Sequence, residues 1–110
     1  MILHIVKKDI WDEALKIGEY RGDTLASDDF IHCSKPDQVI EVADYIFQGT
    51  QGLILLLIDE DKVTSEIKYE DPGNNKLYPH IYGPLNTDAV LKTIDFPANE
   101  NGTFSLPNLD

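Results

Sequence analysis

Positive charge and cysteine are both scarce in this chain. Nine basic against twenty acidic side chains give a formal net charge of −11 over 110 residues. Because such a field repels phosphates at long range, we expect neither bulk nucleic-acid binding nor association with an anionic membrane. A single cysteine excludes an internal disulfide and indicates a reducing compartment.

Long hydrophobic runs are also missing. The longest, residues 53–58, is far too short to span a bilayer, and the first residues lack the basic-then-apolar form of a signal peptide. We therefore expect a cytoplasmic protein. Length and an apolar content of 42% fit one domain over residues 1–96, followed by a loosely ordered tail over residues 97–110 that is rich in Asn and Pro.

Several well-known functional motifs are absent as well. The sequence contains no P-loop, no Gly-x-Gly-x-x-Gly and no Gly-x-Ser-x-Gly. The histidines and the cysteine do not have the spacing of zinc ligands, so we expect no metal site.

Two early segments have helical periodicity, and several later ones have strand character. Residues 9–17 carry a stripe of Ile10, Ala14 and Ile17 beside Trp11, which we interpret as a core anchor. A second helix is expected at about residues 35–48. Strands are expected at residues 2–6, 53–58, 67–70, 77–85 and 89–96, the segment 77–85 being a short or edge strand because of its prolines. This order predicts an α+β fold, with two helices on a bent or split, mostly antiparallel sheet.

Residues 29–38, Asp-Phe-Ile-His-Cys-Ser-Lys-Pro-Asp-Gln, hold the strongest chemical signal. Ser34 and Asp37 have the spacing of a capping box, which predicts a helix that begins there. His32 would then lie in a strand-to-helix elbow, where free backbone N–H groups favour an anionic ligand. The alternative is a well-capped helix preceded by a buried histidine.

Other candidate residues also have two interpretations. His4 shares a strand face with aliphatic residues, so it is either a core histidine or a ligand contact. Arg21, the single arginine, either grips an anion or forms a surface ion pair. Cys33 is a possible nucleophile, although a buried free cysteine is usually a packing residue.

All three histidines lie in strand-like segments, and we expect His4, His32 and His80 to converge on one cleft. Further residues could line that cleft and supply hydrogen bonds or stacking to a ribose or nucleotide: Ser34, Glu70, Tyr78 and Tyr82.

The motifs Leu-His-Ile at residues 3–5, Phe-Ile-His-Cys-Ser at 30–34 followed by Gln38, Tyr-Glu-Asp-Pro at 69–72 and Tyr-Pro-His-Ile-Tyr-Gly-Pro-Leu at 78–85 resemble a small bacterial family called domain of unknown function 952. The resemblance covers roughly residues 1–96. It implies an ADP-ribosyltransferase-like fold, which also occurs in poly-ADP-ribose polymerases and RNA 2′-phosphotransferases.

By that resemblance, His4 would hold the ribose of NAD as a substrate, and His32 would lie near the nicotinamide, with Ser34 nearby. Gln38, which follows the second motif, and Arg21, the single arginine, are further candidate ligand contacts. His80 falls where the superfamily often has glutamate, and Glu70 is a nearby carboxylate. The resemblance thus implies an ADP-ribosyl transferase or NAD glycohydrolase with His4, His32, His80 and Glu70 in catalysis. The substituted acid favours the alternative, a non-catalytic module that binds a nucleotide-like ligand or a protein.

Overall fold

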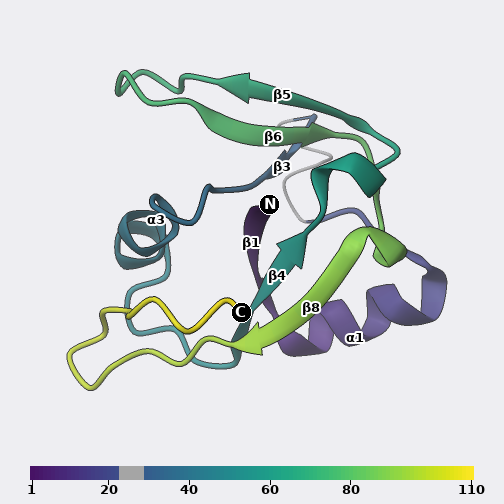
Figure 1. Ribbon diagram of the computed structural model, residues 1–110. Helices are drawn as coiled ribbons and strands as arrows, with labels where there is room; N and C mark the ends of the chain where they lie inside the picture. The colour runs from purple at the N-terminus through teal and green to yellow at the C-terminus, as the bar shows by residue number, and fades with distance from the viewer. Residues whose placement is uncertain (23–28) are drawn as a thin grey trace.

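The computed structural model describes residues 1–22 and 29–110. Within these ranges the chain forms two α-helices and mostly antiparallel sheets, in agreement with the fold class expected from the sequence (Figure 1). The helices are α1 (Lys8–Ile17) and α3 (Val39–Ile46). The strands are β1 (Ile2–Lys7), β2 (Glu19–Tyr20), β3 (Ile31–His32), β4 (Leu53–Ile58), β5 (Glu66–Glu70), β6 (Tyr78–Tyr82), β7 (Leu85–Asn86) and β8 (Val90–Asp95), with short 3-10 turns at Glu60–Lys62 and Thr87–Ala89.

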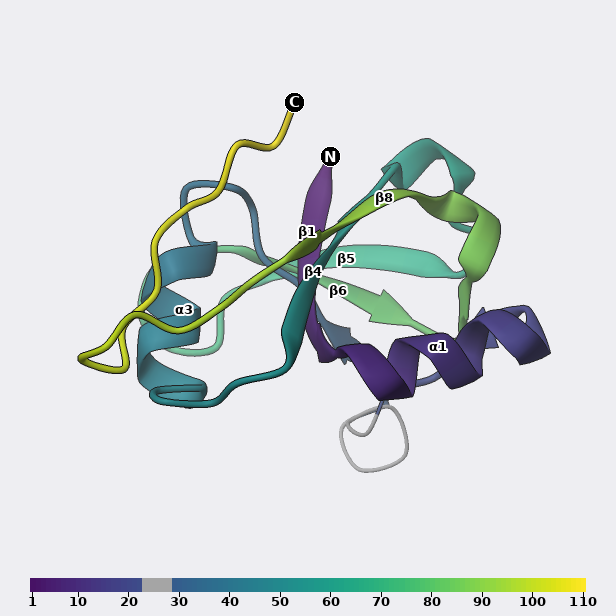
Figure 2. The same cartoon turned by 90° about the horizontal axis from the view of Figure 1, so that it is seen from below.

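The strands form two three-stranded sheets, in the orders β1-β4-β8 and β3-β6-β5, and a short β2-β7 pair. The two larger sheets splay apart, with α3 and α1 at opposite ends of the molecule (Figures 1 and 2). They are joined where Leu3 and Ser34 exchange two backbone hydrogen bonds of 2.8 Å. The sheet is therefore split at the first strand, as the sequence pattern predicted.

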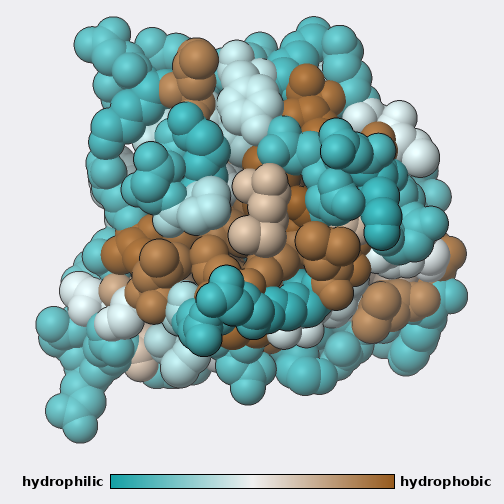
Figure 3. Space-filling view, viewed as in Figure 1, coloured by the Kyte–Doolittle hydropathy of each residue, from teal (hydrophilic) through white to brown (hydrophobic). Residues whose placement is uncertain are grey.

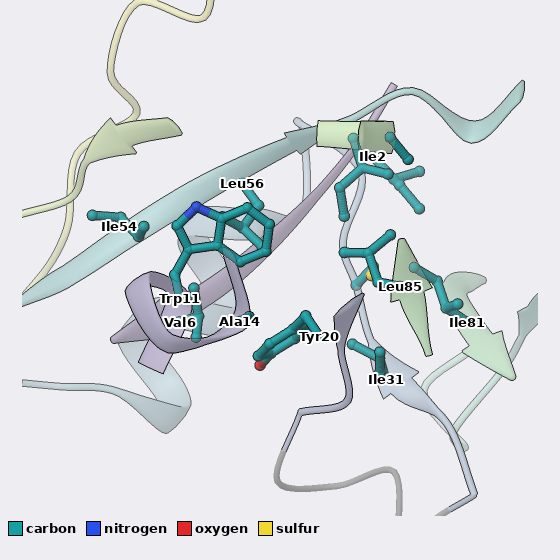
Figure 4. Close-up of a cluster of buried hydrophobic side chains, with 13 residues drawn as sticks. Ile2, Val6, Trp11, Ala14, Tyr20, Ile31, Ile54, Leu56, Ile81 and Leu85 are labelled. Atoms are coloured by element: carbon teal, nitrogen blue, oxygen red, sulfur yellow. The ribbon is translucent and has the colours of Figure 1, made fainter. Parts of the chain in front are cut away.

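β4 is the central strand of the first sheet, and all six of its side chains are buried. Its alternate residues serve two cores, because successive side chains of a strand point to opposite faces. Ile54 and Leu56 pack with Trp11 of α1 and with the second sheet, and this cluster is called the first core (Figure 4). Leu55 and Leu57 pack on the other face with residues of α3 and of the C-terminal segment, and this cluster is called the second core. The unbroken apolar run thus forms a strand that is covered on both faces.

Helix α1 has its expected bounds within one residue, but its exposed face differs from the prediction. Trp11 and Ala14 are buried, whereas Ile10 is half exposed and Ile17 is 74% exposed. The buried face of α1 therefore centres on Trp11 and Ala14 rather than on Ile10 and Ile17, because Trp11 packs with Ile54 and Leu56 of β4. Gly18 ends the helix in the left-handed conformation, with its N–H bonded to the Ala14 carbonyl, as expected.

The second helix begins later than expected, and the predicted capping box does not form. The Ser34 N–H donates to Leu3 instead of to Asp37, because residue 34 belongs to the link between the sheets. Gln38 takes over the role of Asp37: its side-chain oxygen accepts from the Lys35 N–H at 3.0 Å. α3 therefore begins at Val39. His32 lies in β3, seven residues before the start of this helix.

β6 is short, as expected, but it is the middle strand of its sheet rather than an edge strand. Pro79 is tolerated there because its carbonyl still accepts from the Cys33 N–H at 3.0 Å. Gly83 ends the strand at φ +144, and a Cβ at this position would lie 2.5 Å from Ser65 Oγ. Only glycine fits this close approach without strain.

The segment after β8 packs against the second core, even though its composition suggested a loosely held tail. Phe104 is 4% exposed, and its ring stacks on Phe96 at 4.7 Å. The Phe104 N–H donates to the Asp44 carboxylate of α3 at 2.7 Å.

In the space-filling view, apolar residues gather across the middle of the molecule, with hydrophilic residues above and below (Figure 3).

Candidate functional site

The β3-β6-β5 sheet has two chemically different faces. One face is apolar and belongs to the first core through Ile31, Ile67 and Ile81. Alternation of side chains directs the residues between them to the opposite side. We call this opposite surface the histidine face; it includes His32 of β3, Glu66, Lys68 and Glu70 of β5, and Tyr78, His80 and Tyr82 of β6, and the ring of Phe30, which precedes β3, packs on it.

A carboxylate bridges two side chains of this face. Glu70 Oε1 lies 2.9 Å from His80 Nδ1 and also accepts a short hydrogen bond from the Tyr82 hydroxyl. These bonds from Tyr82 and His80 hold the pKa of Glu70 below its usual range. The same Glu70 contact raises the pKa of Tyr82 to about 12. Glu70 is therefore ionised at neutral pH and orients the His80 ring, with the proton on Nδ1 and with Nε2 as the acceptor.

Two rings contact His80. The Phe30 ring is stacked on it, with centroids 4.0 Å apart and an interplanar angle of 18°. The His32 ring meets it edge-on at 5.3 Å, because His32 and His80 are cross-strand partners. His80 is buried, whereas His32 is exposed. The structure thus combines one oriented, covered imidazole with one accessible imidazole.

His4 lies on the other side of this sheet, which differs from the expected convergence of three imidazoles on one cleft. Its side chain shares a face of β1 with Ile2 and Val6, both in the first core. His4 Nδ1 lies 2.5 Å from the His32 carbonyl oxygen, and the Tyr20 hydroxyl lies 2.7 Å from His4 Nε2. The carbonyl accepts from Nδ1–H, so Tyr20 donates to Nε2. His4 of β1 thus links the two sheets by its hydrogen bond to the backbone carbonyl of His32 in β3.

The other candidate ligand contacts are spread over the molecule. The Gln38 amide donates to the Leu77 carbonyl at 2.8 Å, and Ser34 is buried at the link between the sheets. The Arg21 guanidinium is exposed and lies 2.9 Å from the Glu19 carboxylate, which matches the ion-pair alternative. Tyr78, by contrast, is the cross-strand partner of Glu70 and so lies on the histidine face, where its hydroxyl accepts from the Asn74 side chain.

Cys33 points into the first core and is buried. Burial raises the pKa of its thiol well above the usual range, so it has the properties of a packing residue rather than of a nucleophile. In residues 1–22 and 29–110, no group of three His, Cys, Asp or Glu side chains could hold a metal ion.

Sequence reasoning missed three residues of this region. Phe30 stands two positions before His32, so strand alternation could have placed it on the same face. Tyr20 gave no such signal, because its partner His4 is sixteen positions away and the contact depends on the path of α1. Lys68 is a third such residue: its ammonium lies 4.6 Å from the centroid of the Tyr82 ring.

A cavity of about 520 Å³ lies elsewhere, between α1 and the second half of β1. Its walls are mostly apolar, and Tyr20 is its contact with the His4 network. No α-helix in the described ranges has the length and apolarity needed to cross a bilayer.

Comparison with solved structures gives a close match in fold. The crystal structure of protein CC0527 from Caulobacter crescentus superposes with a TM-score of 0.88 at 28% identity, covering 96% of this chain and 93% of that one. The solution NMR structure of the same protein gives a TM-score of 0.81, covering 93% and 89%. Among curated proteins there is no significant match. The sequence model of one family matches residues 5–93, and the chain therefore belongs to that family, described as "Protein of unknown function (DUF952)".

Proposed function

We propose that the histidine face binds the ribose of a nucleotide and cleaves its glycosidic bond, as in ADP-ribosyl transfer or NAD glycohydrolysis. One observation carries this proposal: Glu70 of β5 brings a carboxylate onto His80 and Tyr82, beside the exposed His32. By resemblance to ADP-ribosyltransferases, an acid is expected at the late-strand position that His80 occupies. In this chain the neighbouring strand supplies the acid.

The chemistry suits such a group of residues. When the bond between ribose C1′ and the nicotinamide nitrogen breaks, the electron pair leaves with nicotinamide and positive charge develops on the ribose. An ionised Glu70 beside that ribose favours this charge, because fixed charges act strongly where water is excluded. The acceptor, water or another nucleophile, loses one proton to His80 Nε2, so that hydrolysis gives ADP-ribose, nicotinamide and one proton.

Binding would use the exposed members of the face. His32 can donate to or accept from ribose hydroxyls, and Lys68 is the cation nearest to Tyr82 on this surface. The net charge of −11 opposes the pyrophosphate of NAD, so local contacts have to outweigh a repulsive field. We therefore expect weak ground-state binding that is sensitive to salt.

A second candidate, a non-catalytic nucleotide-binding module, is favoured by one specific observation. His80 is only 6% exposed, and the Phe30 ring covers it. A base that stays covered cannot take a proton from an acceptor. In that case His32 and its surroundings would bind the ligand without turnover.

The two candidates are separated by titrating the ¹⁵N-labelled protein with NAD, ADP-ribose and nicotinamide by NMR, and by measuring nicotinamide release from NAD. Shifts at His32 and His80 with release support the enzyme, and shifts without release support the module. Glu70→Gln should abolish release. Glu60→Gln is the matched control: it also removes a carboxylate that accepts from a tyrosine hydroxyl, that of Tyr69, but outside the histidine face, and it should retain release. The absence of shifts at millimolar NAD and ADP-ribose would overturn both.

A further inference from the structure

The Phe30 ring touches three other rings on the histidine face. It stacks on His80, tilts against Tyr82 at 5.1 Å and meets His32 edge-on at 4.6 Å. A single side chain of the protein thus occupies the place where the rings of three strand residues meet.

The stacking on His80 has the geometry that a flat ligand ring would adopt. Aromatic rings of a protein and a ligand pair by offset stacking, with nearly parallel planes. At 4.0 Å and 18°, Phe30 covers one side of the imidazole in this way. The Phe30 ring and a ligand ring therefore cannot lie on this side of His80 at the same time.

Phe30 lies outside the β3-β6 ladder, because it precedes β3, which begins at Ile31. Its side chain is half buried, whereas His80 and the next residue, Ile31, are buried. Rotation of the Phe30 side chain would uncover His80 without breaking any pair of the β3-β6 ladder.

We infer that Phe30 is an internal competitor: its ring occupies, on His80, the subsite of a planar heteroaromatic ring of the ligand and has to rotate away before that ring binds. The inference rests on the proposed function for the identity of the site, and it adds how the site is kept closed.

The affinity for a ring-bearing ligand is then lowered by the fraction of molecules in which Phe30 covers His80. Removing the ring removes this competition. Because one aromatic pair is lost, we expect Phe30→Ala to bind nicotinamide about three- to tenfold more tightly than the unmodified protein. Phe30→Leu keeps apolar bulk but no flat ring, and its affinity should be intermediate. Ribose 5-phosphate, which has no aromatic ring, should bind all forms equally.

The test is a set of NMR titrations of these proteins with nicotinamide and with ribose 5-phosphate. Tyr45→Ala is the matched control, since it removes an aromatic ring that is 89% exposed on α3, and it should leave both affinities unchanged. Thermal melting of each variant checks folding. The Hε1 resonance of His80 checks the stacking itself, because Phe30→Ala removes a ring current and should shift it downfield.

Tighter binding of nicotinamide by Phe30→Ala, with ribose 5-phosphate unchanged, supports the inference. Weaker or equal binding, or no binding of nicotinamide to the alanine variant at millimolar concentration, overturns it. The proposed function fails separately: if the variant binds nicotinamide more tightly but no form releases nicotinamide from NAD, the transfer chemistry is removed and the role of Phe30 stands.

Discussion

The two faces of the β3-β6-β5 sheet are built from alternate residues of the same strands, yet they differ in almost every property. Ile81 is completely buried among aliphatic side chains, while its neighbour His80 is buried among hydrogen-bonding and aromatic groups. Apolar burial is sufficient to stabilise a sheet on one face. A cluster of an oriented histidine, a carboxylate and a tyrosine on the other face costs desolvation that apolar side chains do not, so the proposed chemistry and the stability of the sheet depend on opposite faces.

The largest expected effect lies on the apolar face. Ile81→Ala should lower the free energy of unfolding by about 2–5 kcal/mol, because it leaves a cavity in the first core. His32→Ala, at the exposed edge of the other face, should cost about 1 kcal/mol from lost ring contacts. Urea denaturation measures both. Equal losses would mean that the histidine face stabilises the fold as much as the apolar face does.

The next effect concerns the turn that sets β6 against its neighbours. Gly83→Ala should lower the free energy of unfolding by about 1–3 kcal/mol, because it combines positive φ with a Cβ 2.5 Å from Ser65 Oγ. It should also disturb the hydrogen bond from Ser65 to the Pro84 carbonyl.

Gly73→Ala is the matched control for this turn. Gly73 lies in the same hairpin at φ +122, with nothing within 4 Å of an added Cβ, so only the backbone strain remains. A smaller loss in Gly73→Ala identifies the contact with Ser65 as the additional cause. Losses of the same size would show that strain alone explains the glycine.

The fold was predictable from the sequence where a single pattern decided it. Six consecutive apolar residues can form only a strand covered on both faces, and β4 is that strand. The helix start at Ser34 was mispredicted because the backbone of Ser34 bonds to Leu3, thirty-one positions earlier, and no local pattern reports that partner. The tail was misjudged for the same reason, since Phe104 depends on α3 and Phe96.

The candidate site was predictable in part. Period-two alternation places His80 and Tyr82 on one face of β6. Their association with His32 and Glu70 depends on the β3-β6-β5 register, which the sequence alone does not fix. His4 was assigned to the same cleft by its residue type, but its partner Tyr20 holds it on the core side.

Removing a tyrosine hydroxyl on each side compares these two networks directly. Tyr20→Phe leaves His4 Nε2 buried without its donor, which should cost about 1–3 kcal/mol of unfolding free energy. Tyr82→Phe removes a donor to a half-exposed carboxylate, and its main effect should be a higher pKa of Glu70. Urea denaturation and NMR titration of the Glu70 carboxyl carbon separate the two outcomes. A stability loss confined to Tyr82→Phe would mean that the Tyr82–Glu70 bond, and not the Tyr20–His4 bond, stabilises the fold.

The smallest expected effect is a change in the pKa of Tyr82 when its hydrogen bond to Glu70 is removed. The Glu70 bond raises the pKa of Tyr82 to about 12, so the stability from this bond is present below the ordinary tyrosine value of 10.0 and is lost as pH rises through about 12. For Glu70, with its pKa lowered, the contribution is present above the ordinary carboxyl value of 4.5 and is lost as pH falls through the lowered value. Glu70→Gln should therefore lower the pKa of Tyr82, followed as tyrosinate absorbance against pH.

Tyr69 is the internal control for this titration. Burial and its hydrogen bond to Glu60 raise the pKa of Tyr69 to about 12 as well, through groups outside the histidine face. In Glu70→Gln, only one of the two late-titrating tyrosines should move, and Tyr82→Phe should remove that one alone. In Glu60→Gln, Tyr69 should move and Tyr82 should not. If Glu70→Gln shifts neither tyrosine, the carboxylate does not accept from Tyr82 in solution, and Glu70 is then not positioned to orient His80.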